Sequence, residues 1–352
     1  MLHENTTQQP YTPQQTKPLP QEFTTHLTAA EVGGLLVQYM NATLSDCMFQ
    51  YFLAKDEDRE IRQVISFAQQ VTRSQLRRIG QIFRSDGYPL PIGLTDSDIN
   101  VDAPRLYSDP FFLAYMRNLA RLALNSYSLS LTLSAREDVR QHFQQSIAEM
   151  IEVEDMAVKR EQEKGLYVRA PYIPAPEKPE FIQSSDFMGS LFGDKRPLSA
   201  VEIGNIFVGT QNNIMGKPLL MGFAQTAQSK ELREFFQRGK QIAHKHIEVL
   251  SALLINNDLP APMSLDSYVT NSTVAPFSDK LMLQHTMLIN QAGIMYYGMA
   301  LAGTARLDIA GNYVRLITEA SAYVEDAAQL MIRHKWMEQP PLAVDRQALV
   351  LQ

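Results

Sequence analysis

The stretch LTAAEVG at residues 27–33 returns 171 positions later as LSAVEIG at residues 198–204. The same offset relates identical residues throughout the first half of each copy, from Glu31 and Glu202 to Pro91 and Pro262. Further along the chain the offset becomes 170, where Ser108, Tyr127, Arg136 and Glu149 return as Ser278, Tyr297, Arg306 and Glu319. Self-similarity at such a long period indicates that one domain was duplicated in tandem.

Each copy contains four stretches whose apolar residues recur every three or four positions, which predicts four helices. The clearest stripe is Leu281, His285, Leu288, Ala292, Met295 and Met299. Short connections join the first helix to the second and the third to the fourth, and short connections make antiparallel neighbours. A longer loop, at about 89–108 and 260–278, joins the two pairs. The sequence therefore predicts an all-α protein built as two tandem antiparallel four-helix bundles.

Composition and turn signals give the domain boundaries. We predict a disordered tail at 1–24, a first bundle at 25–169, a Pro-rich linker at 170–197, a second bundle at 198–338 and a C-terminal tail at 339–352. Four prolines in residues 170–179 exclude a helix and favour an extended spacer. The alternative is a docking segment for a proline-recognising partner. As part of a spacer, Tyr172 and Ile173 are expected to lie against the protein surface.

The composition excludes several functional classes. The net charge of -6 provides no basic surface for nucleic acid or an anionic membrane. Apolar runs stay shorter than the ~18 residues that span a bilayer. Cys47 is the only cysteine, so no disulfide can form within the chain, and a reduced, cytoplasmic setting is expected.

The second copy carries one candidate metal ligand on each predicted helix, namely Glu202, His246, His285 and Glu325, with Glu319 competing with Glu325. Both histidines lie in apolar stripes, so their side chains are expected to point inward, where they could hold iron, manganese or zinc. Counting from the turns puts His285 and Glu325 within ~3 Å in height, whereas Glu202 and His246 differ by ~12 Å.

Other observations favour a role for these residues in the core. The Glu-x-x-His motif of di-iron bundles is absent. The matched positions in the first copy are Glu31, Gln75, Tyr115 and Asp155, which contain no histidine. The alternative interpretation is therefore that His246 and His285 are buried histidines hydrogen-bonded to each other, to carboxylates or to water.

An apolar ligand is a further possibility. The predicted second bundle is rich in methionine, which gives an adaptable interior that can hold an apolar molecule or simply fill a core. The methionines are Met215, Met221, Met282, Met287, Met295 and Met299.

Four segments of the sequence are similar to a known family, namely RLYSD at 105–109, KGLYVRAPYIP at 164–174, KHIEV at 245–249 and PFSDKLM at 276–282. They resemble an uncharacterised domain-of-unknown-function family of spore-forming bacteria. The resemblance covers about residues 25–350 and implies two tandem ferritin-like bundles, and some members are labelled spore coat proteins. It implies no activity or catalytic residue. His246 matches a histidine of the family pattern, whereas Gln75 departs from it.

Three functions follow as hypotheses. The first is a non-enzymatic, cytoplasmic factor that is structural or associated with sporulation or stress, and that self-associates or joins a spore assembly. The second is a ferritin-like metal-binding protein or metal-dependent oxidase with its site in the second bundle. The third is a carrier of a small apolar ligand.

Overall fold

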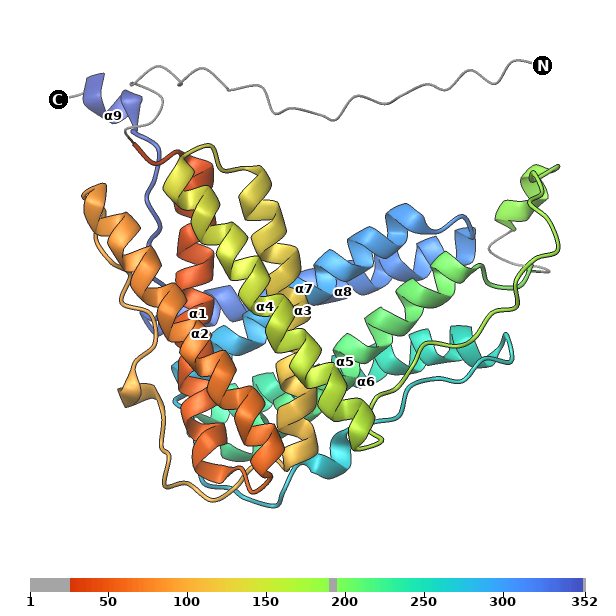
Figure 1. Ribbon diagram of the computed structural model, residues 1–352, viewed down its shortest axis with the longest axis horizontal. Coiled ribbons are helices and arrows are strands. Elements are labelled where there is room, and N and C mark those ends of the chain that lie inside the picture. Colours follow the sequence, from red (N-terminus) through yellow and green to blue (C-terminus); the bar gives the residue numbers. More distant parts are fainter. Residues whose placement is uncertain (1–25, 190–194, 351–352) are drawn as a thin grey trace, which may run out of the picture.

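The computed structural model describes residues 26–189 and 195–350 (Figure 1). The tail predicted at 1–24 lies outside the described residues. The first four-helix bundle consists of α1 (Ala29–Lys55), α2 (Arg59–Ser85), α3 (Asp109–Thr132) and α4 (Glu137–Glu163). The second consists of α5 (Ala200–Thr226), α6 (Lys230–Ile255), α7 (Asp279–Gly303) and α8 (Leu307–Arg333). Short helices are η2 (Asp96–Asp98), η3 (Ser185–Met188), η4 (Asp266–Tyr268) and α9 (Arg346–Val350). The prediction of an all-α protein with two tandem four-helix bundles is confirmed.

Equivalent capping boxes begin α1 and α5. Thr28 and Ser199 each accept a hydrogen bond from the backbone of the glutamate three residues on, and that glutamate accepts one from the cap backbone. The glutamates also tie each helix to the neighbouring pair. Glu31 accepts from the backbone amide of Arg136, and Glu202 accepts from that of Arg306. The first repeated stretch of the sequence therefore fixes both the start of a helix and its place in the bundle.

In each bundle one long loop joins the second helix to the third, and these two loops form hydrogen bonds with each other in the middle of the molecule. Asn100 N donates to Pro276 O over 2.8 Å, and Thr270 N donates to Leu106 O over 2.9 Å. Because the 170-residue offset relates Asn100 to Thr270 and Leu106 to Pro276, these two bonds are equivalent. The copies are thus related by a pseudo-two-fold axis, as in an isologous dimer.

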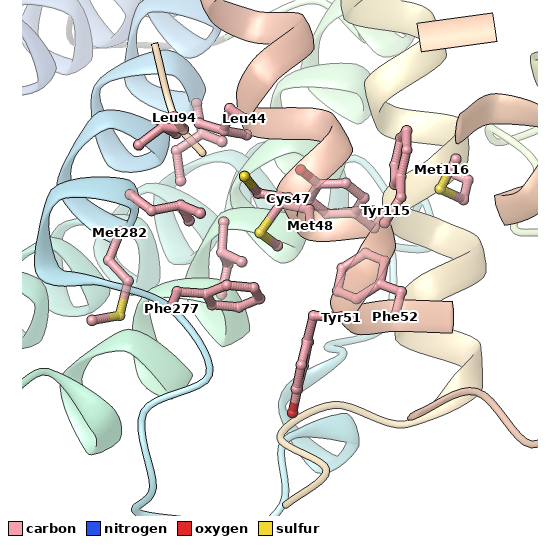
Figure 2. Packing of buried hydrophobic residues seen from close by; sticks show 14 of the residues in the cluster. Leu44, Cys47, Met48, Tyr51, Phe52, Leu94, Tyr115, Met116, Phe277 and Met282 are labelled. Atoms are coloured by element: carbon pink, nitrogen blue, oxygen red, sulfur yellow. The ribbon is translucent and has the colours of Figure 1, made fainter. Parts of the chain in front are cut away.

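A continuous apolar cluster crosses this axis and joins the bundles (Figure 2). Tyr51 of α1 lies beside Phe277, which precedes α7, and the two rings meet edge to face with centroids 5.0 Å apart. Tyr107 reaches across the axis and donates its hydroxyl to Leu219 O. Because this buried apolar cluster contains residues of both bundles, the two bundles form one packed unit.

Two further segments lie outside the bundles. The linker holds Tyr172 83% exposed and Ile173 45% exposed, so the expectation that they lie against the protein surface was wrong. At the other end, residues 336–342 leave α8 and run beside the first bundle (Figure 1). We call residues 336–342 the C-terminal strap.

Candidate functional site

The five predicted metal ligands lie in different surroundings. Glu202 belongs to the α5 capping box and pairs with Arg196, with 2.8 Å between the nearest atoms. Burial raises the pKa of Glu202, but the hydrogen bonds from Arg196 and Ser199 outweigh it and lower the pKa to about 2. Glu325 is exposed on α8. In residues 26–189 and 195–350, no three His, Cys, Asp or Glu side chains are arranged to hold a metal ion.

His246 and Glu319 are the two predicted ligands that the structure brings together. His246 Nε2 lies 3.2 Å from Glu319 Oε2, and Nδ1 lies 3.1 Å from Tyr297 Oη. Burial lowers the pKa of His246 against the opposing effect of Glu319. Burial also raises the pKa of Glu319, but hydrogen bonds from Lys245 and His246 outweigh it, so the net pKa is lowered. We therefore assign the Nε2 proton to a bond donated to the carboxylate, with Tyr297 donating to Nδ1.

The first copy contains the same chain of hydrogen bonds with glutamine in place of histidine. Tyr127 Oη donates to Gln75 Oε1 over 3.2 Å, and Gln75 Nε2 donates to Glu149 Oε2 over 3.2 Å. Offsets of 170 and 171 relate all three positions to Tyr297, His246 and Glu319. We call each set a Tyr–Glu relay. Its repetition without histidine shows that the arrangement is a shared feature of both bundle cores.

His285 lies at the axis between the bundles, where its Nε2 is 2.7 Å from Tyr115 Oη. Tyr115 is the equivalent residue of the first copy, so equivalent positions meet each other. Burial lowers the pKa of His285 to about 4, which keeps the imidazole neutral. His285 does point inward, but toward the first bundle and away from His246.

A cavity with a volume of about 900 Å³ lies between the two bundles. Its walls are α1, α3 and α7, its rim is residues 88–91, and the C-terminal strap covers part of it. Apolar side chains make up most of the lining, including Leu36, Met40, Leu119, Leu122, Met287, Leu288, Met295 and Trp336. The cavity reaches into the first bundle as far as Gln75 and Tyr127.

The structure corrects the expectation that the six methionines lie inside the second bundle. Of the six expected inside the second bundle, only Met215 and Met282 are buried. Met287 and Met295 line the cavity between the bundles, and Met299 is 57% exposed. The predicted apolar stripe of α7 therefore continues across the boundary between the bundles, so that part of it faces the first bundle.

On the other side of the axis, the positions equivalent to part of this lining hold charged side chains. Arg117 and Arg121 stand at the positions of Met287 and Gln291. Arg121 donates to Asn118 Oδ1 over 2.7 Å and lies over the ring of Tyr296. Arg117 pairs with a buried glutamate of α4, Glu161, and lies over the ring of Tyr167. The two copies therefore differ at these positions, which hold arginines in α3 and line an apolar cavity in α7.

The carboxylate of Glu338 ties the C-terminal strap to the first bundle. The two oxygens of Glu338 accept hydrogen bonds from Ile92 N over 2.8 Å and from Gly93 N over 2.7 Å. Gly93 has a φ of 63°, in the region that favours glycine, and this turns its amide toward the strap. Trp336, the only tryptophan of the chain, stacks on His334 and lines the cavity.

Sequence reasoning did not identify this cavity. The pattern that could have revealed it is the contrast between the copies, in which Met287 and Gln291 of α7 replace two arginines of α3. Neither the strap nor its anchor at Glu338 has a sequence signature.

The fold and the cavity define an all-helical protein made of two fused four-helix bundles with an apolar site between them. The chain belongs to the family described as "Protein of unknown function (DUF3231)", whose model matches residues 19–178 and again residues 186–349. The resemblance stated from the sequence is thus confirmed. No functionally curated protein matches the chain.

One solved structure that is similar is described as a "putative spore coat protein" from Bacillus halodurans C-125. It is 22% identical, the match covers 44% of this chain and 97% of that chain, and the TM-score is 0.37. In the described part of this chain, no helix is long and apolar enough to cross a membrane.

Proposed function

We propose that this protein is a cytoplasmic carrier of a small apolar molecule, which it binds in the cavity between the bundles. The observation that carries the proposal is the apolar lining of this cavity, in which Met287 and Gln291 stand where the first copy has Arg117 and Arg121. A volume of about 900 Å³ lies within the range of small-molecule sites, which is roughly 300–1,000 Å³.

Flexible side chains on the cavity wall support this proposal. Met40, Met287 and Met295 come from two helices of different bundles and line the same space. Unbranched thioether side chains adapt to ligands of different shape, which suits a carrier. The C-terminal strap adds a further wall, which the carboxylate of Glu338 ties to the backbone of Ile92 and Gly93.

Trp336 allows a direct binding test because it is the only tryptophan and lines the cavity. The neutral probe N-phenyl-1-naphthylamine absorbs where tryptophan emits, so its binding should quench Trp336 and give sensitised probe emission. We expect saturable quenching with micromolar affinity. The double variant Met287→Arg/Gln291→Arg copies the arginines of the equivalent positions in the first copy and should weaken binding at least tenfold.

The matched control is Met299→Arg, which adds the same side chain to α7 at an exposed position outside the cavity. It should bind the probe like the wild type, and circular dichroism should show that all variants remain helical. Equal probe affinity in the wild type and the double variant would refute the proposal. Mass spectrometry of denatured protein provides an independent test, because a carrier is expected to release a co-purified apolar compound.

A second candidate function is a structural, sporulation- or stress-associated factor that self-associates. The exposed apolar residues of the linker favour it, since Tyr172 is 83% and Phe181 is 92% exposed. Light scattering after size exclusion should then give an oligomer that the variant Tyr172→Ser/Phe181→Ser reduces to a monomer. A monomeric wild type at high concentration would contradict this function.

A further inference from the structure

The lining of the cavity is almost free of charge. Among the described residues that line it, Glu338 is the only charged side chain. Both of its oxygens already accept hydrogen bonds from Ile92 N and Gly93 N. No lysine, arginine or histidine stands among these lining residues to neutralise an anion. An anionic head group in the cavity would therefore lose its hydration without gaining a cation.

The inner end of the cavity offers neutral hydrogen-bonding groups. Thr72, Gln75 and Tyr127 line it there, and all three are buried. Gln75 Nε2 uses one of its two N–H groups to reach Glu149, and Tyr127 Oη donates its proton to Gln75. Gln38 also forms a hydrogen bond with the Tyr127 hydroxyl, so one lone pair of this oxygen remains as an acceptor. The second N–H of Gln75 remains as a donor.

The charges behind this end are neutralised within the protein. Glu149 forms an ion pair with Arg78, with 2.7 Å between Oε2 and the nearest guanidinium nitrogen. Arg78 also donates to His142 Nδ1 over 3.3 Å. Burial lowers the pKa of His142 to about 3, so this imidazole adds no charge. The inner end therefore presents hydrogen bonds with no net charge to attract an ionic ligand.

A further acceptor lies on the α7 wall. Gln284 Oε1 is shielded from solvent and has no hydrogen-bond partner among the described residues. Gln284 lines the same cavity. A buried acceptor without a partner is costly, and a hydroxyl group of a ligand would satisfy it.

We propose that the ligand is a neutral amphipathic molecule, an apolar chain or ring system that ends in an uncharged hydroxyl or carbonyl group, with this group at Gln75 and Tyr127. A hydroxyl can donate to Tyr127 and accept from Gln75, and a carbonyl can accept from Gln75. Fatty-acid anions are disfavoured because the lining holds no cation. This inference rests on the proposed carrier function and specifies its ligand class.

The test compares two ligands that share one chain. 1-Dodecanol and dodecanoate are titrated at pH 8 against the complex of wild-type protein with N-phenyl-1-naphthylamine, below the critical micelle concentration of dodecanoate. Sensitised probe emission from Trp336 reports displacement. We expect dodecanol to displace the probe at a concentration at least tenfold lower than dodecanoate. Equal displacement, or a preference for dodecanoate, would overturn the ligand class while the carrier function stood.

Two variants locate the head group. Tyr127→Phe removes the hydroxyl at the inner end and should weaken dodecanol binding about fivefold without changing probe affinity. Tyr313→Phe removes a buried hydroxyl of α8 that does not line the cavity and should leave both unchanged. Equal dodecanol affinity in wild type and Tyr127→Phe would refute the assigned position.

Different results would contradict the carrier function and the ligand class. If N-phenyl-1-naphthylamine does not quench Trp336 at all, the carrier function fails together with the ligand class. If the probe binds but dodecanol does not displace it, the cavity is apolar throughout and the assigned head group is wrong. Should Tyr127→Phe not fold, the preference for dodecanol over dodecanoate in the wild type still decides the ligand class.

Discussion

Replacing His285 with glutamine should remove about 1.3 kcal/mol from the pH dependence of folding between pH 7.5 and 5.5. His285 is buried at the axis against Tyr115 and Phe223, and burial lowers its pKa to about 4. In the unfolded chain the same imidazole titrates near its ordinary pKa of about 6.5. Glutamine does not titrate, and its amide can still bond to the hydroxyl of Tyr115.

The sign follows from proton binding. Below about pH 6.5 the unfolded chain takes up a proton at His285 and the folded protein does not, so the free energy of unfolding falls as the pH falls. With a folded pKa of about 4, this loss amounts to about 1.3 kcal/mol at pH 5.5 relative to pH 7.5. Asp56 and Glu161 act in the opposite direction, because burial raises the pKa of each to about 6. The comparison of variant with wild type cancels their contribution.

Urea unfolding followed by circular dichroism at both pH values gives the required free energies. The effect of His285→Gln on stability should become more favourable by about 1.3 kcal/mol on going from pH 7.5 to pH 5.5. His26→Gln is the control, because the side chain of His26 is 87% exposed. If wild type and His285→Gln lose stability equally over this range, His285 is accessible to protons in the folded state and the argument fails.

Three further predictions concern the backbone and the strap. Gly222→Ala should lower the free energy of unfolding by about 1–3 kcal/mol, because a Cβ there overlaps the ring of Tyr107. Gly204→Ala adds a Cβ in open space and should raise the free energy of unfolding by up to about 1 kcal/mol. Urea unfolding measures both changes. Lys335→Gly should raise stability by about 1 kcal/mol, since Lys335 has a φ of 58° and glycine stands at the equivalent place of the first copy. Glu338→Ala should release the strap and speed dissociation of the naphthylamine probe severalfold in stopped flow; unchanged dissociation would show that the strap is no barrier.

The sequence predicted the fold well because its information is repeated and local. Capping residues such as Thr28 and Ser199 set the helix starts in both copies, and apolar spacing of three and four residues fixed the buried faces. The same periodicity placed His246 and His285 inside the protein, where they lie. Periodicity defines which face of a helix is buried, and this much follows from one sequence.

Which neighbour that face meets depends on tertiary packing. His285 and Met295 belong to one α7 stripe, but the first contacts Tyr115 across the axis and the second lines the cavity. Turn counting gave heights along a helix and carried no information on the angle at which two bundles pack. For that reason His285 and Glu325, which turn counting put at nearly the same height, lie apart, one at the interface between the bundles and the other in solvent. The domain boundaries and metal binding by the full set of five residues remain predictions.

The two Tyr–Glu relays provide a test of what His246 does. Glutamine at 246 would reproduce the first copy, with its amide donating to Glu319 and its carbonyl oxygen accepting from Tyr297, as Gln75 does with Glu149 and Tyr127. The variant His246→Gln should therefore cost less than about 1 kcal/mol. His246→Leu leaves the buried O–H of Tyr297 without the acceptor of its proton, while Asn213 still donates to its oxygen, and should cost about 2–3 kcal/mol. Thermal unfolding with and without added zinc or a chelator separates this role from metal binding, because an amide is a poor substitute for imidazole as a zinc ligand. If zinc raises the melting temperature of the wild type and not that of His246→Gln, His246 is a metal ligand. If zinc changes both melting temperatures equally, His246 serves the Tyr–Glu relay.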